Sequence, residues 1–201
     1  MIDVAKYEPR DKYYRKARQQ GLPSRAAFKI EELLARIKLP ADARVIDLGC
    51  APGGWLAILG ATVGESGRII GIDLAACKGF GPSVETLVAD IRDATLPDLI
   101  REKFGRPADL VTSDLAPKLT GIRDRDDAQF VELIDAALAL ASRTLKPGGT
   151  MIAKLFMSAT FKAIVARFEK NFAKVEVTKV KATRPGSSEL YIIARGFRAF
   201  H

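Results

Sequence analysis

The sequence predicts an α/β fold, built on a largely parallel, doubly wound sheet with helices on both faces. The strand candidates are short segments rich in Val and Ile: residues 43–49, 67–74, 84–90, 108–115, 150–156, 174–181 and 189–197. Helical patterns separate most of them, near 54–63, 93–104, 126–145 and 158–171. Strands that alternate with helices favour parallel pairing, and the last two strands, which no helix separates, predict an antiparallel hairpin at the end of the sheet.

Composition favours one folded domain. A chain of 201 residues that is 48% hydrophobic can bury one substantial core. Its longest apolar runs fall short of the roughly 18 residues that cross a bilayer, and residues 1–20 are charged rather than typical of a signal peptide, so we expect a cytoplasmic protein without membrane contact. Cys50 and Cys77 lack metal-ligand spacing and are expected to be reduced thiols, with no metal site.

The amino-terminal segment carries much of the positive charge. The chain has a net charge of +8, which favours a polyanionic partner, although many basic proteins bind none. The basic residues of this part are Lys6, Arg10, Lys12, Arg15, Lys16, Arg18, Arg25 and Lys29. Tyr7, Tyr13 and Tyr14 are interleaved with them, as phosphate contacts combined with base stacking would require. We predict an RNA-contacting arm over residues 1–22 and one domain over 23–201; a merely solvated amphipathic arm is the alternative.

A helix is predicted over "SRAAFKIEELLARI", residues 24–37. Ser24 can cap its first turn through the hydroxyl group. One apolar stripe recurs at helical spacing: Ala26, Ala27, Ile30, Leu33, Leu34 and Ile37. Lys29 lies off this stripe, about a quarter turn from Ile30, and is therefore expected to face something other than the core.

The segment "VIDLGCAPGGW", residues 45–55, predicts a ligand site at the carboxyl edge of the sheet. A strand leads into a tight glycine turn and then a helix, so the backbone can approach a ligand closely. The spacing matches neither the dinucleotide fingerprint nor the triphosphate loop. Asp73 and Asp90 close the next two strands, where carboxylates can meet ribose hydroxyls and an adenine amino group. The pattern indicates a nucleoside cofactor held without phosphate contacts.

Several further segments, in order along the chain, resemble one known family. These are "LPSRAAFKIEEL", "VIDLGCAPGGW", "GIDL", "ADIRD", "SDLAPKLTG", "LKPGGTMIAKLF" and "RPGSSELYIIARGF". Together they resemble the FtsJ/RrmJ-like (RlmE-type) RNA 2'-O-ribose methyltransferases, which use S-adenosylmethionine, over residues 10–198. The resemblance implies a Rossmann-like methyltransferase sheet of seven strands and a catalytic tetrad of Lys29, Asp114, Lys154 and Glu189. It also places Gly53, Trp55, Asp73, Asp90 and Asp114 at cofactor-contacting positions.

The residue types suit this chemistry. Methyl transfer from a sulfonium needs a positioned acceptor and the removal of one proton, and burial beside a second cation favours the neutral, proton-accepting form of a lysine. Lys154, on a buried central strand, is expected to accept the proton, while Lys29, nearer solvent, stays charged and orients the acceptor. The only histidine is His201, and "SDLAPK" offers no cysteine nucleophile.

The resemblance also implies a target. Compact bacterial-type members of the family act on a uridine in the A-loop of 23S ribosomal RNA within the large (50S) subunit, and we expect the same of this chain, acting as a monomer. Because "DKYYRKARQQG" also resembles members that act on tRNA, 2'-O methylation of an anticodon loop is the alternative. Pro23 and Lys118 depart from the family pattern near the expected RNA face. A catalytically idle RNA-binding assembly factor and a small-molecule O-methyltransferase are the remaining alternatives.

Overall fold

The computed structural model describes residues 12–77, 79–184 and 186–199. Its strands are β1 (Arg44–Leu48), β2 (Arg68–Asp73), β3 (Val84–Val88), β4 (Ala108–Ser113), β5 (Leu145–Phe156), β6 (Phe172–Thr178) and β7 (Glu189–Phe197). Its helices are α1 (Lys12–Gln19), α2 (Ala27–Leu34), α3 (Gly54–Thr62), α4 (Leu96–Phe104), α5 (Arg123–Thr144) and α6 (Phe161–Asn171).

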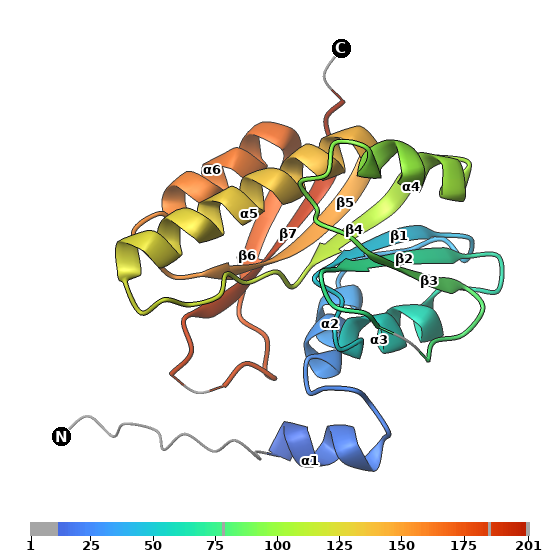
Figure 1. Ribbon diagram of the computed structural model, residues 1–201, viewed down its shortest axis with the longest axis horizontal. Coiled ribbons are helices and arrows are strands. Elements are labelled where there is room, and N and C mark those ends of the chain that lie inside the picture. Colours follow the sequence, from blue (N-terminus) through green and yellow to red (C-terminus); the bar gives the residue numbers. More distant parts are fainter. Residues whose placement is uncertain (1–11, 78, 185, 200–201) are drawn as a thin grey trace.

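The strands form one sheet in the order β3-β2-β1-β4-β5-β7-β6 (Figure 1). Strands β1 to β5 pair in parallel, whereas β7 pairs antiparallel with both β5 and β6. The predicted α/β class and the terminal antiparallel hairpin are therefore confirmed. The last strand of the chain enters the sheet between β5 and β6, so its first residue lies at the edge where the parallel strands end.

Helices cover both faces of the sheet. Apolar residues of α4, α5 and α6 pack on one face, and those of α2 and α3 pack on the other (Figure 1). Strand β1 contributes to both layers, because successive side chains alternate: Ile46 and Leu48 join the first cluster and Val45 joins the second. Among the described residues, no helix combines the length and the apolar character needed to cross a membrane.

Helix α2 carries the predicted stripe but begins later than the sequence indicated. Ala27, Ile30 and Leu33 are completely buried. The Ser24 hydroxyl accepts a hydrogen bond from the Ala26 amide at 3.3 Å, which closes a turn before the helix rather than capping it.

The described part of the amino-terminal arm forms a helix that the sequence analysis did not assign. Helix α1 packs against α2 through Ala17, which is 2% exposed, and through Tyr13, whose ring centroid lies 5.7 Å from that of Phe28. Tyr13 thus contributes to packing rather than standing free for a base. Tyr7 and the other arm residues before Lys12 lie outside the described residues.

Candidate active site

The four predicted catalytic side chains meet at the edge where the parallel strands end. Lys154 lies near the end of β5, Asp114 follows the last residue of β4, and Glu189 begins the antiparallel strand β7. Lys29 approaches the same place from α2, which packs on one face of the sheet. Strand order therefore brings together residues that are as many as 160 positions apart in the sequence.

The four side chains form two ion pairs. The Lys154 Nζ donates a hydrogen bond to the backbone carbonyl of Asp114 at 2.8 Å and lies 3.2 Å from its carboxylate Oδ1. The Lys29 Nζ lies 2.6 Å from Glu189 Oε1. Both pairs are largely shielded from water, which strengthens their electrostatic interaction.

Tyr191 joins this cluster, although the sequence analysis did not single it out. Its hydroxyl donates a hydrogen bond to Glu189 Oε1 at 2.7 Å, and its ring centroid lies 5.9 Å from the Lys29 Nζ. The sequence signal that could have identified Tyr191 is its spacing from Glu189, because residues two apart on a strand lie on the same face.

The two carboxylates of the cluster respond oppositely to their surroundings. Burial raises the pKa of Asp114, and the attraction of Lys154 and Lys29 offsets this only in part. Burial also acts to raise the pKa of Glu189, but the charge and hydrogen bond of Lys29, with the Tyr191 hydroxyl, hold that pKa below its ordinary value. Lys29 therefore faces the more readily ionised carboxylate, and Lys154 faces the less readily ionised one.

The two lysines differ only slightly in exposure. Lys29 was expected to lie nearer solvent than Lys154, and their side chains are 13% and 10% exposed, a small difference in the expected direction. Both ammonium groups lie beside a carboxylate, Glu189 for Lys29 and Asp114 for Lys154. The two lysines therefore differ more in their counter-ions than in their exposure.

A cavity of about 340 Å³ adjoins the tetrad at the ends of β1, β2 and β4. Its lining is formed by the glycine turn, the residues that follow β2 and β3, and the segment after β4: Gly49, Ala51, Ile72, Asp73, Leu74, Ala89, Asp90, Ile91, Arg92, Asp114, Leu115, Ala116 and Leu133. Its volume falls within the range of small-molecule sites. Asp73, Asp90 and Asp114, all predicted cofactor contacts, share this cavity.

Asp73 fastens the glycine turn to the end of β2. Its two carboxylate oxygens accept hydrogen bonds from the backbone amides of Ala51 and Ala75, each at 2.9 Å. Each carboxylate oxygen can accept more than one hydrogen bond, so Asp73 retains capacity for ligand hydroxyl groups.

Asp90 is engaged by a neighbour. The guanidinium of Arg92 donates to both of its carboxylate oxygens, at 2.5 to 3.1 Å. These hydrogen bonds lower the pKa of Asp90 to about 2. Any contact from Asp90 to an adenine amino group would therefore share the carboxylate with Arg92.

Gly53 and Trp55 lie outside the lining of this cavity. Gly53 has φ +103°, a backbone conformation that favours glycine, and a Cβ there would come within 2.1 Å of the Phe80 ring, which would have to move. Trp55 is 3% exposed and packs against Tyr191 at 6.1 Å between ring centroids. Its indole Nε1 has no hydrogen-bond partner in the part of the chain that the structure describes.

Asp47 adds a buried carboxyl group near this turn. It is completely buried in β1 and accepts a hydrogen bond from the Thr112 hydroxyl at 2.7 Å. Burial raises its pKa to about 8, which the nearby Asp114 and Asp73 charges reinforce. Asp47 is therefore mainly protonated at neutral pH and adds little negative charge to the site.

The chain is similar to known methyltransferases over nearly its whole length. The family model described as FtsJ-like methyltransferase matches residues 22–197. Ribosomal RNA large subunit methyltransferase E of an Anaeromyxobacter species (strain Fw109-5) is 42% identical over 96% of this chain and 70% of its own length. The protein of the same name from Myxococcus xanthus is 40% identical, over 96% of this chain and 92% of its own length.

Solved structures share the fold. A ribosomal RNA methyltransferase from Plasmodium falciparum superposes with a TM-score of 0.74 and 24% identity, covering 87% of this chain and 98% of that chain. A methyltransferase structure from Streptococcus mutans in complex with SAH superposes with a TM-score of 0.54 and 11% identity, covering 83% and 93%. At these identities the likeness shows the fold alone.

Proposed function

Because the chain belongs to the FtsJ-like methyltransferase family, we propose that it methylates a ribose 2'-hydroxyl of large-subunit ribosomal RNA, with a uridine of the 23S A-loop as the target. S-adenosylmethionine is the methyl donor. The observation that carries the proposal is the convergence of Lys29, Asp114, Lys154 and Glu189 into two adjoining ion pairs beside the cavity that Asp73 lines.

The cavity fits the proposed donor. Asp73 offers carboxylate oxygens to a ribose, and Asp114, which lies 3.2 Å from the Lys154 ammonium, lines the same cavity. A carboxylate oxygen accepts more than one hydrogen bond, so Asp114 can also receive the ammonium of an amino acid group.

The protein's task is to hold the acceptor and remove its proton. When bound, S-adenosylmethionine supplies a methyl group activated by the sulfonium, so the leaving group needs no further assistance. The Lys154 amine, in its neutral form, takes the 2'-hydroxyl proton, and its hydrogen bond to the Asp114 carbonyl fixes its position. Lys29, held by Glu189, stays charged and orients the acceptor oxygen.

The counter-ions support this division of work. Glu189 is readily ionised and stabilises the ammonium form of Lys29, whereas burial disfavours the charged form of Asp114, the partner of Lys154. This difference between the two carboxylates supports Lys154, rather than Lys29, as the proton acceptor.

RNA binding is proposed for the basic surface of α1. Lys12, Arg15, Lys16 and Arg18 are exposed on this short helix. Because α1 packs on Phe28 of α2, the helix that also carries Lys29, phosphate contacts there would guide RNA toward the tetrad.

The test is transfer of tritiated methyl groups to isolated large ribosomal subunits, total RNA and tRNA, followed by mapping of the modified nucleotide. We expect one modified ribose in large-subunit RNA. Label in tRNA would support the anticodon-loop alternative, and label on a base rather than a ribose would overturn the assigned chemistry. An RNA-binding protein that labels none of these substrates would be an idle assembly factor.

A further inference from the structure

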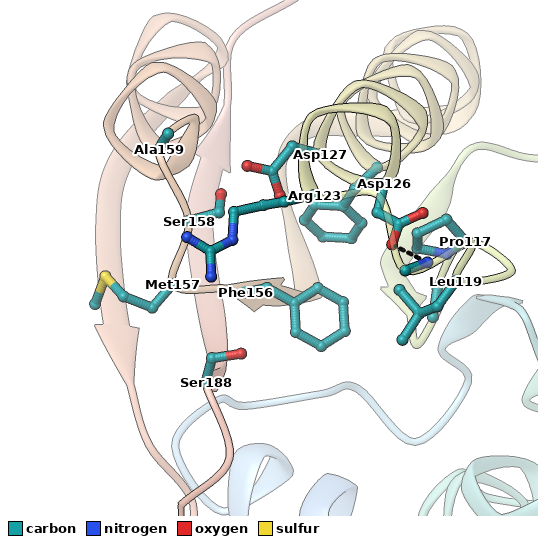
Figure 2. A pocket seen from close by; sticks show the side chains of 13 residues that line it. Pro117, Leu119, Arg123, Asp126, Asp127, Phe156, Met157, Ser158, Ala159 and Ser188 are labelled. Atoms are coloured by element: carbon teal, nitrogen blue, oxygen red, sulfur yellow. Dashed lines mark hydrogen bonds between the residues drawn. The ribbon is translucent and has the colours of Figure 1, made fainter.

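A second and larger cavity, of about 760 Å³, lies beside the tetrad (Figure 2). The segment after β4, the start of α5, the end of β5 and Ser188 enclose it. Both cavities include Ala116, and β4 lies between β1 and β5 in the sheet, so the segment that carries Asp114 separates the two cavities.

The aromatic ring of Phe156 connects this cavity to the tetrad. Phe156 follows Lys154 by two residues on β5, and the Lys154 Nζ lies 5.6 Å from the centroid of its ring. In the antiparallel pairing with β7, Phe156 stands opposite Glu189. A ligand group stacked on this ring would therefore lie close to the Nζ of Lys154, the proposed proton acceptor.

The ring is held in place and remains accessible. Phe130 of α5 packs against it, with centroids 5.0 Å apart and planes at 66°. Phe156 is half-buried, and Figure 2 shows its ring among the lining side chains, between Ser188 and Leu119. A fixed, partly exposed aromatic ring is the platform on which nucleic-acid bases stack.

The rim of the cavity offers a cation. Arg123, in the first turn of α5, is exposed, and its side chain makes no hydrogen bond or ion pair with any residue that the structure describes. Figure 2 shows its side chain extending toward the segment of Ser158. The adjacent loop is ordered by Asp126, which accepts hydrogen bonds from the amides of Thr120 and Gly121 at 2.8 and 3.1 Å.

We propose that this cavity receives the base of the acceptor nucleotide, turned out of the RNA stack, with Phe156 as its stacking partner and Arg123 on a neighbouring phosphate. The inference rests on the proposed function. In a nucleotide the base is bonded to C1' of the ribose, next to the C2' that carries the reacting hydroxyl. When that hydroxyl meets Lys154, the base must lie in an adjoining space, and the cofactor takes the other cavity.

The lining suits this occupant. Phe156, Phe130 and Leu119 provide apolar surface, while Ser158 and Asp127 provide polar groups for the edge of a base. Single-stranded bases are recognised in proteins by the same combination of aromatic stacking and polar edge contacts.

The test compares three single variants with the parent in RNA methylation. Phe156→Leu keeps apolar bulk but removes the stacking face, and Phe156→Trp keeps the face. Phe161→Leu, on a partly buried ring at the start of α6 that does not line the cavity, is the matched control. All are checked for donor affinity and thermal unfolding.

We expect Phe156→Leu to lower kcat/KM for RNA by about 5- to 150-fold, with unchanged donor affinity, as loss of one stacked base predicts. Phe156→Trp should retain most activity. If Phe156→Leu matches Phe161→Leu, or if Phe156→Trp is as impaired as Phe156→Leu, the ring serves packing only and the inference is overturned. A parent protein that methylates no RNA would instead refute the proposed function.

Arg123 provides an independent measurement. Arg123→Ala should reduce the slope of log affinity against log salt for RNA by about 0.7 to 0.9, the contribution of one phosphate contact. Arg125→Ala, two residues further along α5 and outside the cavity lining, should leave the slope unchanged. Equal salt slopes for the two variants would show that Arg123 makes no phosphate contact.

Discussion

The lysines of the tetrad and the lysines of α1 show one side chain in two environments. Lys154 and Lys29 are 10% and 13% exposed and lie within 3.2 Å of a carboxylate. Lys12 and Lys16 are exposed, and their ammonium groups lie over the rings of Tyr13 and Phe28 at 5.2 and 4.7 Å. Burial holds a lysine against specific partners, as the proposed proton transfer requires, whereas exposure leaves it a salt-sensitive charge for binding polyanions.

The largest effect should come from Lys154. We expect Lys154→Ala to slow methyl transfer by about 10²- to 10⁴-fold, the usual contribution of a positioned proton acceptor, with donor affinity unchanged. Lys154→Arg keeps a cation beside Asp114, so it should fold normally and be equally inactive, because a guanidinium stays protonated. Lys162→Ala, on the exposed surface of α6, is the control. If either Lys154 variant transfers methyl groups at nearly the parent rate, Lys154 is not the proton acceptor, and the contrast drawn between the two groups of lysines is wrong.

Lys29 should matter less. Lys29→Ala is expected to slow transfer by about 10- to 100-fold, since it orients the acceptor without taking the proton. Lys29→Arg should keep more activity than Lys29→Ala. Equal activity of Lys29→Arg and Lys29→Ala would show that the charge at this position does not orient the acceptor.

A variant of Asp73 tests donor binding independently of the tetrad. Asp73→Ala should weaken S-adenosylmethionine binding by about 5- to 150-fold, measured by calorimetry, because charge-assisted hydrogen bonds are lost and the amides of Ala51 and Ala75 lose their acceptor. Asp98→Ala, on the exposed surface of α4, is the matched control. The same affinity in both variants would refute the assignment of Asp73.

The smallest effect concerns the exposed cations. Replacing Lys12, Arg15 and Arg18 together by Gln should weaken RNA binding and lower its salt slope by about two to three, while donor affinity stays the same. The control replaces Lys162, Lys170 and Lys174, exposed on β6 and on α6, which packs on the opposite face of the sheet from α2. Equal salt slopes for the two triple variants would make α1 an ordinary solvated surface.

Much of the fold could be predicted from local patterns in the sequence. The alternation of apolar strands and helical stripes predicted each strand, with ends shifted by a few residues: β5 begins at Leu145 rather than 150, and α5 begins at Arg123 rather than 126. Helix α1 was missed because its polar sequence has only Ala17 buried, and its packing partner Phe28 belongs to another element. A short helix stabilised by tertiary contact leaves little local signal.

The sequence by itself determined the class of fold, the glycine turn and the residue types of the site, because period-2 and period-3.6 patterns are local properties of the chain. Only the tertiary structure decided which residues meet. The insertion of β7 beside β5 set Glu189 opposite Phe156, and the counter-ions distinguished Lys29 from Lys154. These contacts depend on strand order, register and burial, which join distant residues and which no local pattern encodes.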